Sequence, residues 1–173
     1  VNSYLINTGS KLVLVDPGAG TMFGPALGKL AINMKAAGYD PSQVDAVLIT
    51  HMHVDHIGGL IDAGGKPAFP KATVYVSKEE SDFWLSKSEA EKVPVEMRKY
   101  FTMAQKAAEP YIAANKWKTF EGGDLPVPGI RAIPIYGHTA GHTAFEVKSV
   151  NDTMLIIGDM VHSMMIQFTL PEV

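Results

Sequence analysis

The hydrophobic positions in the first half of the chain form short β-branched runs separated by turn residues. The runs at 1–7 and 11–16, with Thr-Gly-Ser at 8–10 between them, predict a β-hairpin. Apolar residues at helical spacing predict a helix that starts near Leu27 and stops at Gly38. Two further short strands are predicted at 44–50 and 72–77.

The second half begins with a helical block and then returns to strands. Residues 79–115 are mostly helical in pattern, with Ser77 as a cap and Glu80 three residues later, and with interruptions near Pro94 and Pro110. Strands follow at 118–120, 130–136, 143–147 and 154–157. Strands, a helical block and strands again, with no repeat or linker, predict a single α/β sandwich domain over residues 1–173.

Composition and charge narrow the class of protein. Hydrophobic residues make up 46% of the 173 residues and charged residues 19%, so the chain can bury a core. A net charge of −3 disfavours nucleic-acid binding, because a phosphate backbone requires a basic surface. No apolar run reaches the roughly 18 to 20 residues that span a bilayer. Because there is no cysteine, a metal site in this chain would be built from histidine and carboxylate side chains.

Five of the six histidines lie in two short motifs, each directly after a predicted strand. The first motif, at 51–56, reads His-Met-His-Val-Asp-His. In a tight loop, His51 and His53 can face one metal ion while Asp55 and His56 turn toward a second position. Two ions about 3.5 to 4 Å apart can activate a shared water and stabilise both the attacking and the leaving oxygen. The spacing therefore favours a site for two metal ions.

Two further motifs supply the remaining candidates. The stretch 137–143 reads Gly-His-Thr-Ala-Gly-His-Thr, and His138 is the candidate third ligand of the first ion. His142 is interpreted as a structural histidine that bonds to the backbone or to another site residue. Asp159 ends a strand beside a glycine, where a carboxylate can bridge two cations. His162 could line the mouth of the site and is not counted as a ligand.

Together these motifs resemble the metallo-β-lactamase superfamily, in which they occur in the same order. The resemblance covers nearly the whole chain and is closest to the methyl parathion hydrolase branch. The stretches that look like that branch are 7–16, 50–53, 82–86 and 167–168. The resemblance implies an αβ/βα sandwich with two metal ions at one edge of two facing sheets.

The resemblance also implies roles for single residues. The ligands would be divided between two divalent ions: His51, His53 and His138 on the first, Asp55 and His56 on the second, and Asp159 bridging both. Asp55 and Asp159 are thus the catalytic candidates. The ions would be zinc, or otherwise cobalt, manganese or iron, and a hydroxide bridging them would be the nucleophile. Asp16 would orient a ligand histidine.

The end of the chain departs from the family pattern. The second ion of the family needs one more histidine on a later strand, and only His162 follows Asp159 before Val173. We therefore expect the chain to be a truncated form of a longer protein that lacks the last strands and helices of the fold.

The residues expected at the mouth of the site are apolar. Trp84, Phe83 and Phe101 lie in the helical block that covers the metals in the resembling branch. Four more large apolar side chains follow Asp159 closely and make the rim rich in methionine: Met164, Met165, Ile166 and Phe168. Such a rim suits an uncharged aryl substrate, for example a dialkyl aryl phosphotriester. Phe83 and residues 164–166 fit a core role slightly better, whereas Trp84 is interpreted as a pocket residue.

Other functions stay open at this point. A lactonase or arylesterase would use the same site on a carbonyl, and a metal-binding but catalytically silent fragment would lack turnover. A thioester hydrolase is disfavoured because no basic cluster lies beside the motifs. The resemblance suggests a homodimer and export to the bacterial periplasm or beyond. The expected binding partner is a small-molecule substrate, either an ester or a phosphotriester.

Overall fold

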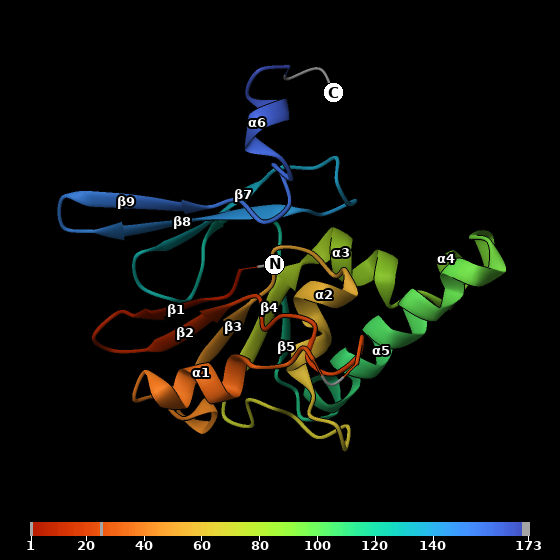
Figure 1. The fold of residues 1–173 in the computed structure, drawn as a ribbon, viewed down its shortest axis with the longest axis horizontal. Coiled ribbons are helices and arrows are strands. Elements are labelled where there is room, and N and C mark those ends of the chain that lie inside the picture. The colour runs from red at the N-terminus through yellow and green to blue at the C-terminus, as the bar shows by residue number, and fades with distance from the viewer. Residues whose placement is uncertain (1, 25, 171–173) are drawn as a thin grey trace.

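Two β-sheets lie face to face in the computed structural model, which describes residues 2–24 and 26–170 (Figure 1). The first sheet runs in the order β1-β2-β3-β4-β5, with β1 antiparallel to β2 and the other neighbours parallel. Its strands are β1 (Tyr4–Asn7), β2 (Leu12–Val15), β3 (Ala46–Leu48), β4 (Thr73–Ser77) and β5 (Trp117–Phe120). The second sheet is antiparallel and contains β6 (Gly123–Asp124), β7 (Ile130–Pro134), β8 (Thr143–Ser149) and β9 (Asp152–Ile156).

Helices cover the face of the first sheet that is turned away from the second (Figure 1). The helices are α1 (Leu30–Ala36), α2 (Val54–Ile57), α3 (Lys78–Trp84), α4 (Lys87–Lys92), α5 (Arg98–Ala113) and α6 (Met164–Gln167). Of these, α6 alone stands on the side of the second sheet, where Figure 1 shows it beyond β8 and β9. The predicted α/β sandwich is confirmed. No helix in the described parts of the chain is long and apolar enough to cross a membrane.

Strict alternation in β2 explains the two layers of core. Leu12 and Leu14 pack in the cluster that joins the first sheet to the helices. Val13 and Val15 point the other way and pack against residues of the second sheet such as Phe145. β2 is buried on both faces between these two layers, and every one of its residues is apolar.

The predicted strands are all present, with their ends shifted by a few residues, and the predicted hairpin pairs Tyr4 with Val15. Val1, which was included in that hairpin, lies outside the described residues. One predicted interruption is wrong, because Pro110 lies inside α5. A proline this close to a helix end removes only one backbone hydrogen bond, and the buried ring of Tyr111 holds the last turn against the core.

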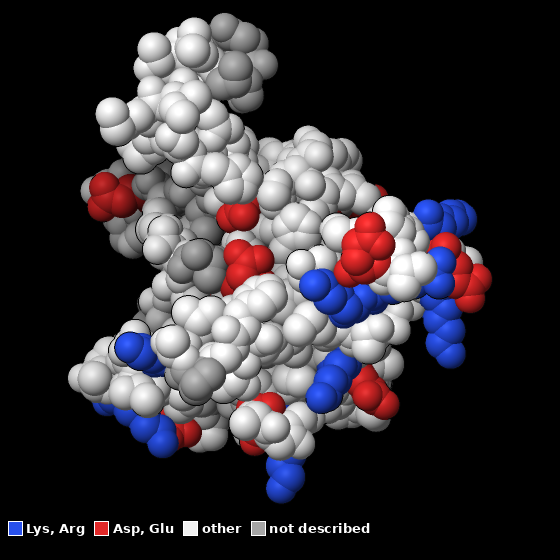
Figure 2. Space-filling view, turned by 45° about the vertical axis from the view of Figure 1, so that its right-hand side comes forward, with Lys and Arg blue, Asp and Glu red and all other residues white. Residues whose placement is uncertain are grey.

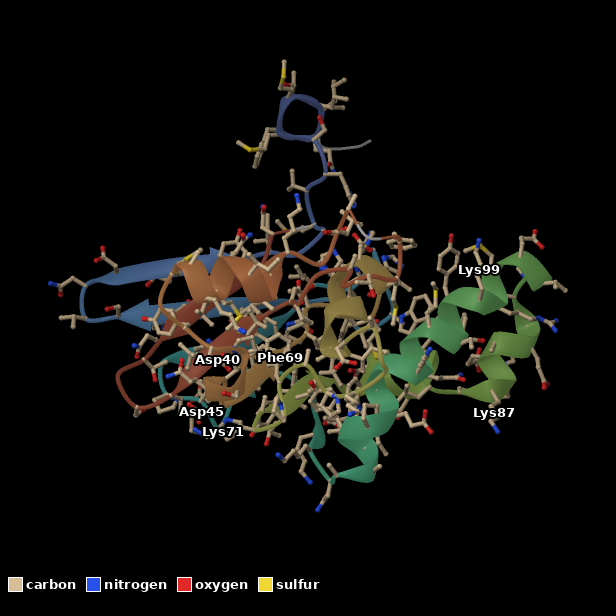
Figure 3. All side chains as sticks on the ribbon, turned by 60° about the horizontal axis from the view of Figure 1, so that its bottom comes forward. Asp40, Asp45, Phe69, Lys71, Lys87 and Lys99 are labelled. Carbon is tan, nitrogen blue, oxygen red and sulfur yellow. The ribbon has the colours of Figure 1, made fainter. Side chains whose placement is uncertain are left out.

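The two edges of the parallel strands carry different side chains. Near the amino ends of β3 and β4, Lys71 Nζ lies 2.6 Å from Asp45 Oδ1, and Asp45 Oδ2 accepts from the Leu12 amide at 2.8 Å. Figure 3 shows Asp45 and Lys71 together at this edge, well away from Lys87 and Lys99 on the helical side. The opposite edge, at the carboxyl ends of the strands, carries the histidines. Ligands of open α/β sheets bind at such carboxyl edges.

Candidate metal centre

The predicted ligands come from loops and from the short helix α2 at one edge of the two sheets. The motif at 51–56 follows β3, and Asp16 follows β2. His138 lies in the loop between β7 and β8, and Asp159 follows β9. Figure 2 shows acidic side chains in a hollow of this face, whereas the Lys and Arg side chains lie on its lower and right-hand parts. The fold thus brings together candidate ligands that are up to 108 positions apart, from His51 to Asp159.

Three imidazole nitrogens converge at the first predicted ion position. His53 Nδ1 lies 3.1 Å from His51 Nε2 and 3.0 Å from His138 Nε2. The three ligand atoms lie within 4.8 Å of one another. The rings of these residues stand nearly perpendicular to one another, at 80° to 86°, so their edges share a common point.

Asp159 lies between this three-histidine set and the second predicted ion position, which is marked by His56. Its Oδ1 lies 3.1 Å from His56 Nε2, and its Oδ2 lies 3.6 Å from His138 Nε2. The two oxygens of one carboxylate therefore face both groups of nitrogens, as a bridging ligand must. Asp55 Oδ2 lies 3.5 Å from His56 Nε2, and its side chain is about half exposed. Asp55 belongs to none of the tight three-residue groups in the described part of the chain, and His51 takes that place beside His56 and Asp159.

The protonation states of the histidines at this site favour the binding of a cation. Burial, together with the neighbouring imidazoles, lowers the pKa of His51 far below its ordinary value. Burial also lowers the pKa of His53 and of His138. These rings are therefore neutral, with lone pairs free to bind a metal. His56 Nε2 is buried and has no hydrogen-bond partner among the described residues. A buried nitrogen of this kind is costly without a partner, and a divalent ion supplies one.

Asp16 fixes the orientation of His56. One oxygen of the buried Asp16 carboxylate accepts from the Thr50 amide at 2.9 Å, and the other accepts from the Thr50 hydroxyl and from His56 Nδ1 at 2.7 and 2.9 Å. This bond places the ring proton on Nδ1 and leaves the Nε2 lone pair toward Asp159. Burial lowers the pKa of His56, but the bond to Asp16 and the nearby carboxylates outweigh it and raise the pKa overall. Asp16 adopts φ of 51°, an uncommon backbone conformation that aims its side chain inward.

The two remaining histidines hold Asp159 from different sides. The buried His142 accepts from the Asp159 amide through Nε2 at 3.1 Å, so its Nδ1 carries the proton and donates to the Ile135 carbonyl at 3.3 Å. This is the backbone-bonding role that the sequence indicated. His162 is mostly exposed, and its Nε2 lies 3.3 Å from Asp159 Oδ2. It joins His138 and Asp159 in a third group of potential ligands, closer to the metal position than the sequence suggested.

The aromatic candidates lie beside His53. Trp84 packs edge-on against His53, with ring centroids 5.5 Å apart, and lines a cavity of about 270 Å³ together with Phe23 and Tyr100. Phe101 is buried behind Trp84, with centroids 4.7 Å apart, and does not line this cavity. Phe83 packs against both of these rings and does not line it either. The cavity wall thus uses Phe23 and Tyr100, which the sequence did not single out.

Sequence reasoning also missed the role of Glu80. Its motif with Ser77 predicted a capping box, in which the Glu80 side chain turns back to the helix start. The Ser77 hydroxyl does accept from the Glu80 amide at 3.2 Å. The Glu80 carboxylate instead points into the fold and accepts backbone N–H groups from two loops that carry histidines. A glutamate in the first turn of a helix that follows β4, at the same edge as the motifs, was the available signal.

The family model of the metallo-beta-lactamase superfamily matches residues 1–171, and the chain belongs to this superfamily. Among solved structures it is similar to the hydrolase AbOPH of the beta-lactamase superfamily, at 41% identity and a TM-score of 0.92, over 99% of this chain and 60% of that one. It is also similar to AidC, a dizinc quorum-quenching lactonase solved with a product, at 27% identity and a TM-score of 0.85, over 96% of this chain and 58% of that one.

Similar proteins are also found among curated sequences. A "probable metallo-hydrolase" of Mycobacterium tuberculosis is 27% identical over 175 residues, which cover 90% of this chain and 54% of that protein. An N-acyl homoserine lactonase of Bacillus thuringiensis is 26% identical over 116 residues, which cover 67% of this chain and 38% of the lactonase. The chain therefore spans about half the length, or less, of these relatives. Placement in the methyl parathion hydrolase branch stays a prediction.

Proposed function

We propose that the protein is a metal-dependent hydrolase of small uncharged esters, with aryl phosphotriesters as the first candidate class. The observation that carries this proposal is an apolar cavity directly beside the metal ligands. Trp84, Tyr100 and Phe23 line the same cavity as His53 and Asp55. Flat aromatic walls suit an aryl leaving group, and a cavity with few polar atoms suits a substrate without charge.

Each group of residues has a part in this chemistry. When bound, a pair of divalent cations, for which we propose Zn²⁺, would supply an activated water and polarise the phosphoryl or carbonyl oxygen. His51, His53 and His138 would hold the ion nearest the cavity, and Asp159 would face both ions. Because Trp84 lies against the His53 ring, a substrate stacked on its indole would place the scissile bond near the ligands.

Lactones are the second candidate class, because two of the similar proteins are named as lactonases. A lactone is also uncharged, and its carbonyl could take the position of a phosphoryl oxygen at the same site. Export and dimer formation rest on the resemblance alone and stay predictions.

A substrate panel on the full chain, loaded with Zn²⁺, tests the proposal. We expect kcat/KM for a dialkyl aryl phosphotriester to exceed kcat/KM for an N-acyl lactone and for an aryl carboxylic ester. The reverse order for the lactone would replace the first candidate by the second. Absence of turnover on all three by a metal-loaded, folded protein would refute the hydrolase proposal and leave a silent metal-binding scaffold.

Replacing Trp84 by alanine should raise KM for the aryl phosphotriester by about 5- to 20-fold with metal content unchanged, because the substrate loses its stacking surface. Trp84→Phe keeps an aromatic wall and should lie within about threefold of wild type. Steady-state kinetics on both variants, with metal analysis of the same samples, checks this. Unchanged KM for Trp84→Ala would place the indole outside the substrate pocket.

A further inference from the structure

A fully buried carboxylate lies between the two histidine loops without belonging to either. Glu80, in the first turn of α3, has no exposed surface. Its Oε2 accepts the Met52 amide at 2.9 Å, and Met52 stands between His51 and His53. Its Oε1 accepts the Gly141 amide at 2.9 Å, in the loop that carries His138 and His142. One side chain therefore binds both loops through their backbones.

The contact with the second loop uses both the amide and the carbonyl group of Gly141. While Glu80 accepts the Gly141 amide, the Ser77 hydroxyl donates to the Gly141 carbonyl at 2.8 Å. A Cβ atom at position 141 would lie 2.2 Å from the Ser77 oxygen and 2.6 Å from the Glu80 amide nitrogen. Only glycine permits this approach, so the loop is held directly against the start of α3.

The geometry points to Glu80 as a positioning residue for the first metal ion: it fixes the distance between the two loops so that His138 meets His51 and His53. We infer this because the three-histidine set draws its ligands from both of the loops that Glu80 joins. His56, in the second set, is held instead by Asp16. This inference rests on the proposed metal-dependent function and deepens it, since it names what sets the affinity of one of the two positions.

Any buried, hydrogen-bonded side chain contributes to stability, so the test must separate this contribution from an effect on metal binding. Tyr111 serves as the matched control. Tyr111 is also buried and also joins two backbone groups, since its hydroxyl donates to the Leu60 carbonyl at 2.8 Å and accepts from the Phe69 amide at 3.2 Å. Neither of those groups belongs to a histidine loop. Tyr111→Phe should therefore lower the melting temperature and leave metal affinity unchanged.

The test is competition for Zn²⁺ between the protein and a chromophoric chelator, using wild type, Glu80→Gln and Tyr111→Phe of the full chain. Gln keeps the length of Glu80 but turns one acceptor into a donor that faces an amide N–H. We expect Glu80→Gln to lower the Zn²⁺ affinity of the first site, which is formed by His51, His53 and His138, by about 10- to 100-fold. The affinity of the second site should fall less. The Co²⁺-loaded variant should also show a changed visible absorption spectrum, since the geometry of the ligands has moved.

Several outcomes decide the matter. Zn²⁺ affinity of Glu80→Gln within about twofold of wild type, with a lowered melting temperature as in Tyr111→Phe, would make Glu80 merely structural and overturn the inference. If Glu80→Gln does not fold, Ser77→Ala takes its place, and unchanged affinity in Ser77→Ala would overturn the inference equally. Failure of the wild-type protein to bind Zn²⁺ would instead refute the proposed function itself, so the two failures are distinguishable.

Discussion

Replacing His53 or Asp159 by alanine should lower kcat/KM by about 10³-fold or more, the largest effect on activity that we expect from a single substitution. His53 Nδ1 lies at the centre of the three-histidine set, and Asp159 faces both sets of nitrogens. Each variant thus removes a proposed ligand, and its loss should change metal occupancy or geometry, which is more than the loss of one hydrogen bond.

Steady-state kinetics and metal analysis on the same preparations check this prediction. Circular dichroism serves as the control, because both residues are partly exposed and their truncation should leave the fold intact. Wild-type turnover by either variant with full metal content would show that the assigned residues are not the ligands.

Replacing Gly59 by alanine should lower the free energy of unfolding by about 3 kcal/mol or more, the largest stability effect that we expect. A Cβ atom there would lie 2.1 Å from the Pro17 carbonyl oxygen, and the Gly59 amide donates to the Gly18 carbonyl at 2.7 Å. Backbone cannot yield as a flexible side chain does. The loop after Asp16 would therefore move away from the 51–56 motif, and the bond between Asp16 and His56 would weaken with it.

Gly64→Ala is the matched control for this substitution. Its Cβ atom would meet only the Asp62 side chain, at 3.3 Å, on an exposed turn. We expect a change within about 1 kcal/mol. Chemical denaturation of both variants measures the difference. Equal stability of Gly59→Ala and wild type would mean that the close approach of the two backbones is not required.

The strands could be predicted from the sequence because their signal is local, and the candidate ligands could be named for the same reason. A strand buried on both faces, such as β2, is an unbroken apolar run in the sequence, and the 51–56 motif places candidate ligands at fixed short spacings. Contacts between residues that lie far apart in the sequence were harder to predict. That Asp159 reaches His56 Nε2 depends on how two sheets meet, and no local pattern encodes that distance.

The misses have the same physical origin. Glu80 was interpreted through its helix-capping pattern with Ser77, whereas tertiary contacts with Met52 and Gly141 determine where its side chain points. Phe83 and Phe101 were candidates for the mouth of the site because they lie in the helical block that covers the metals in the resembling branch, although Phe83 fitted a core role slightly better. The side chains that face the cavity come partly from the segment around Phe23, which is remote in sequence.

Metal stoichiometry of the full chain tests the central claim most directly. We would saturate the wild-type protein and the Asp159→Ala variant with Zn²⁺, remove free ions by gel filtration, and count bound ions per chain by elemental mass spectrometry. We predict about two ions per wild-type chain and clearly fewer in Asp159→Ala. A folded wild-type protein without bound metal, or equal stoichiometry in the two proteins, would contradict a two-ion centre bridged by Asp159.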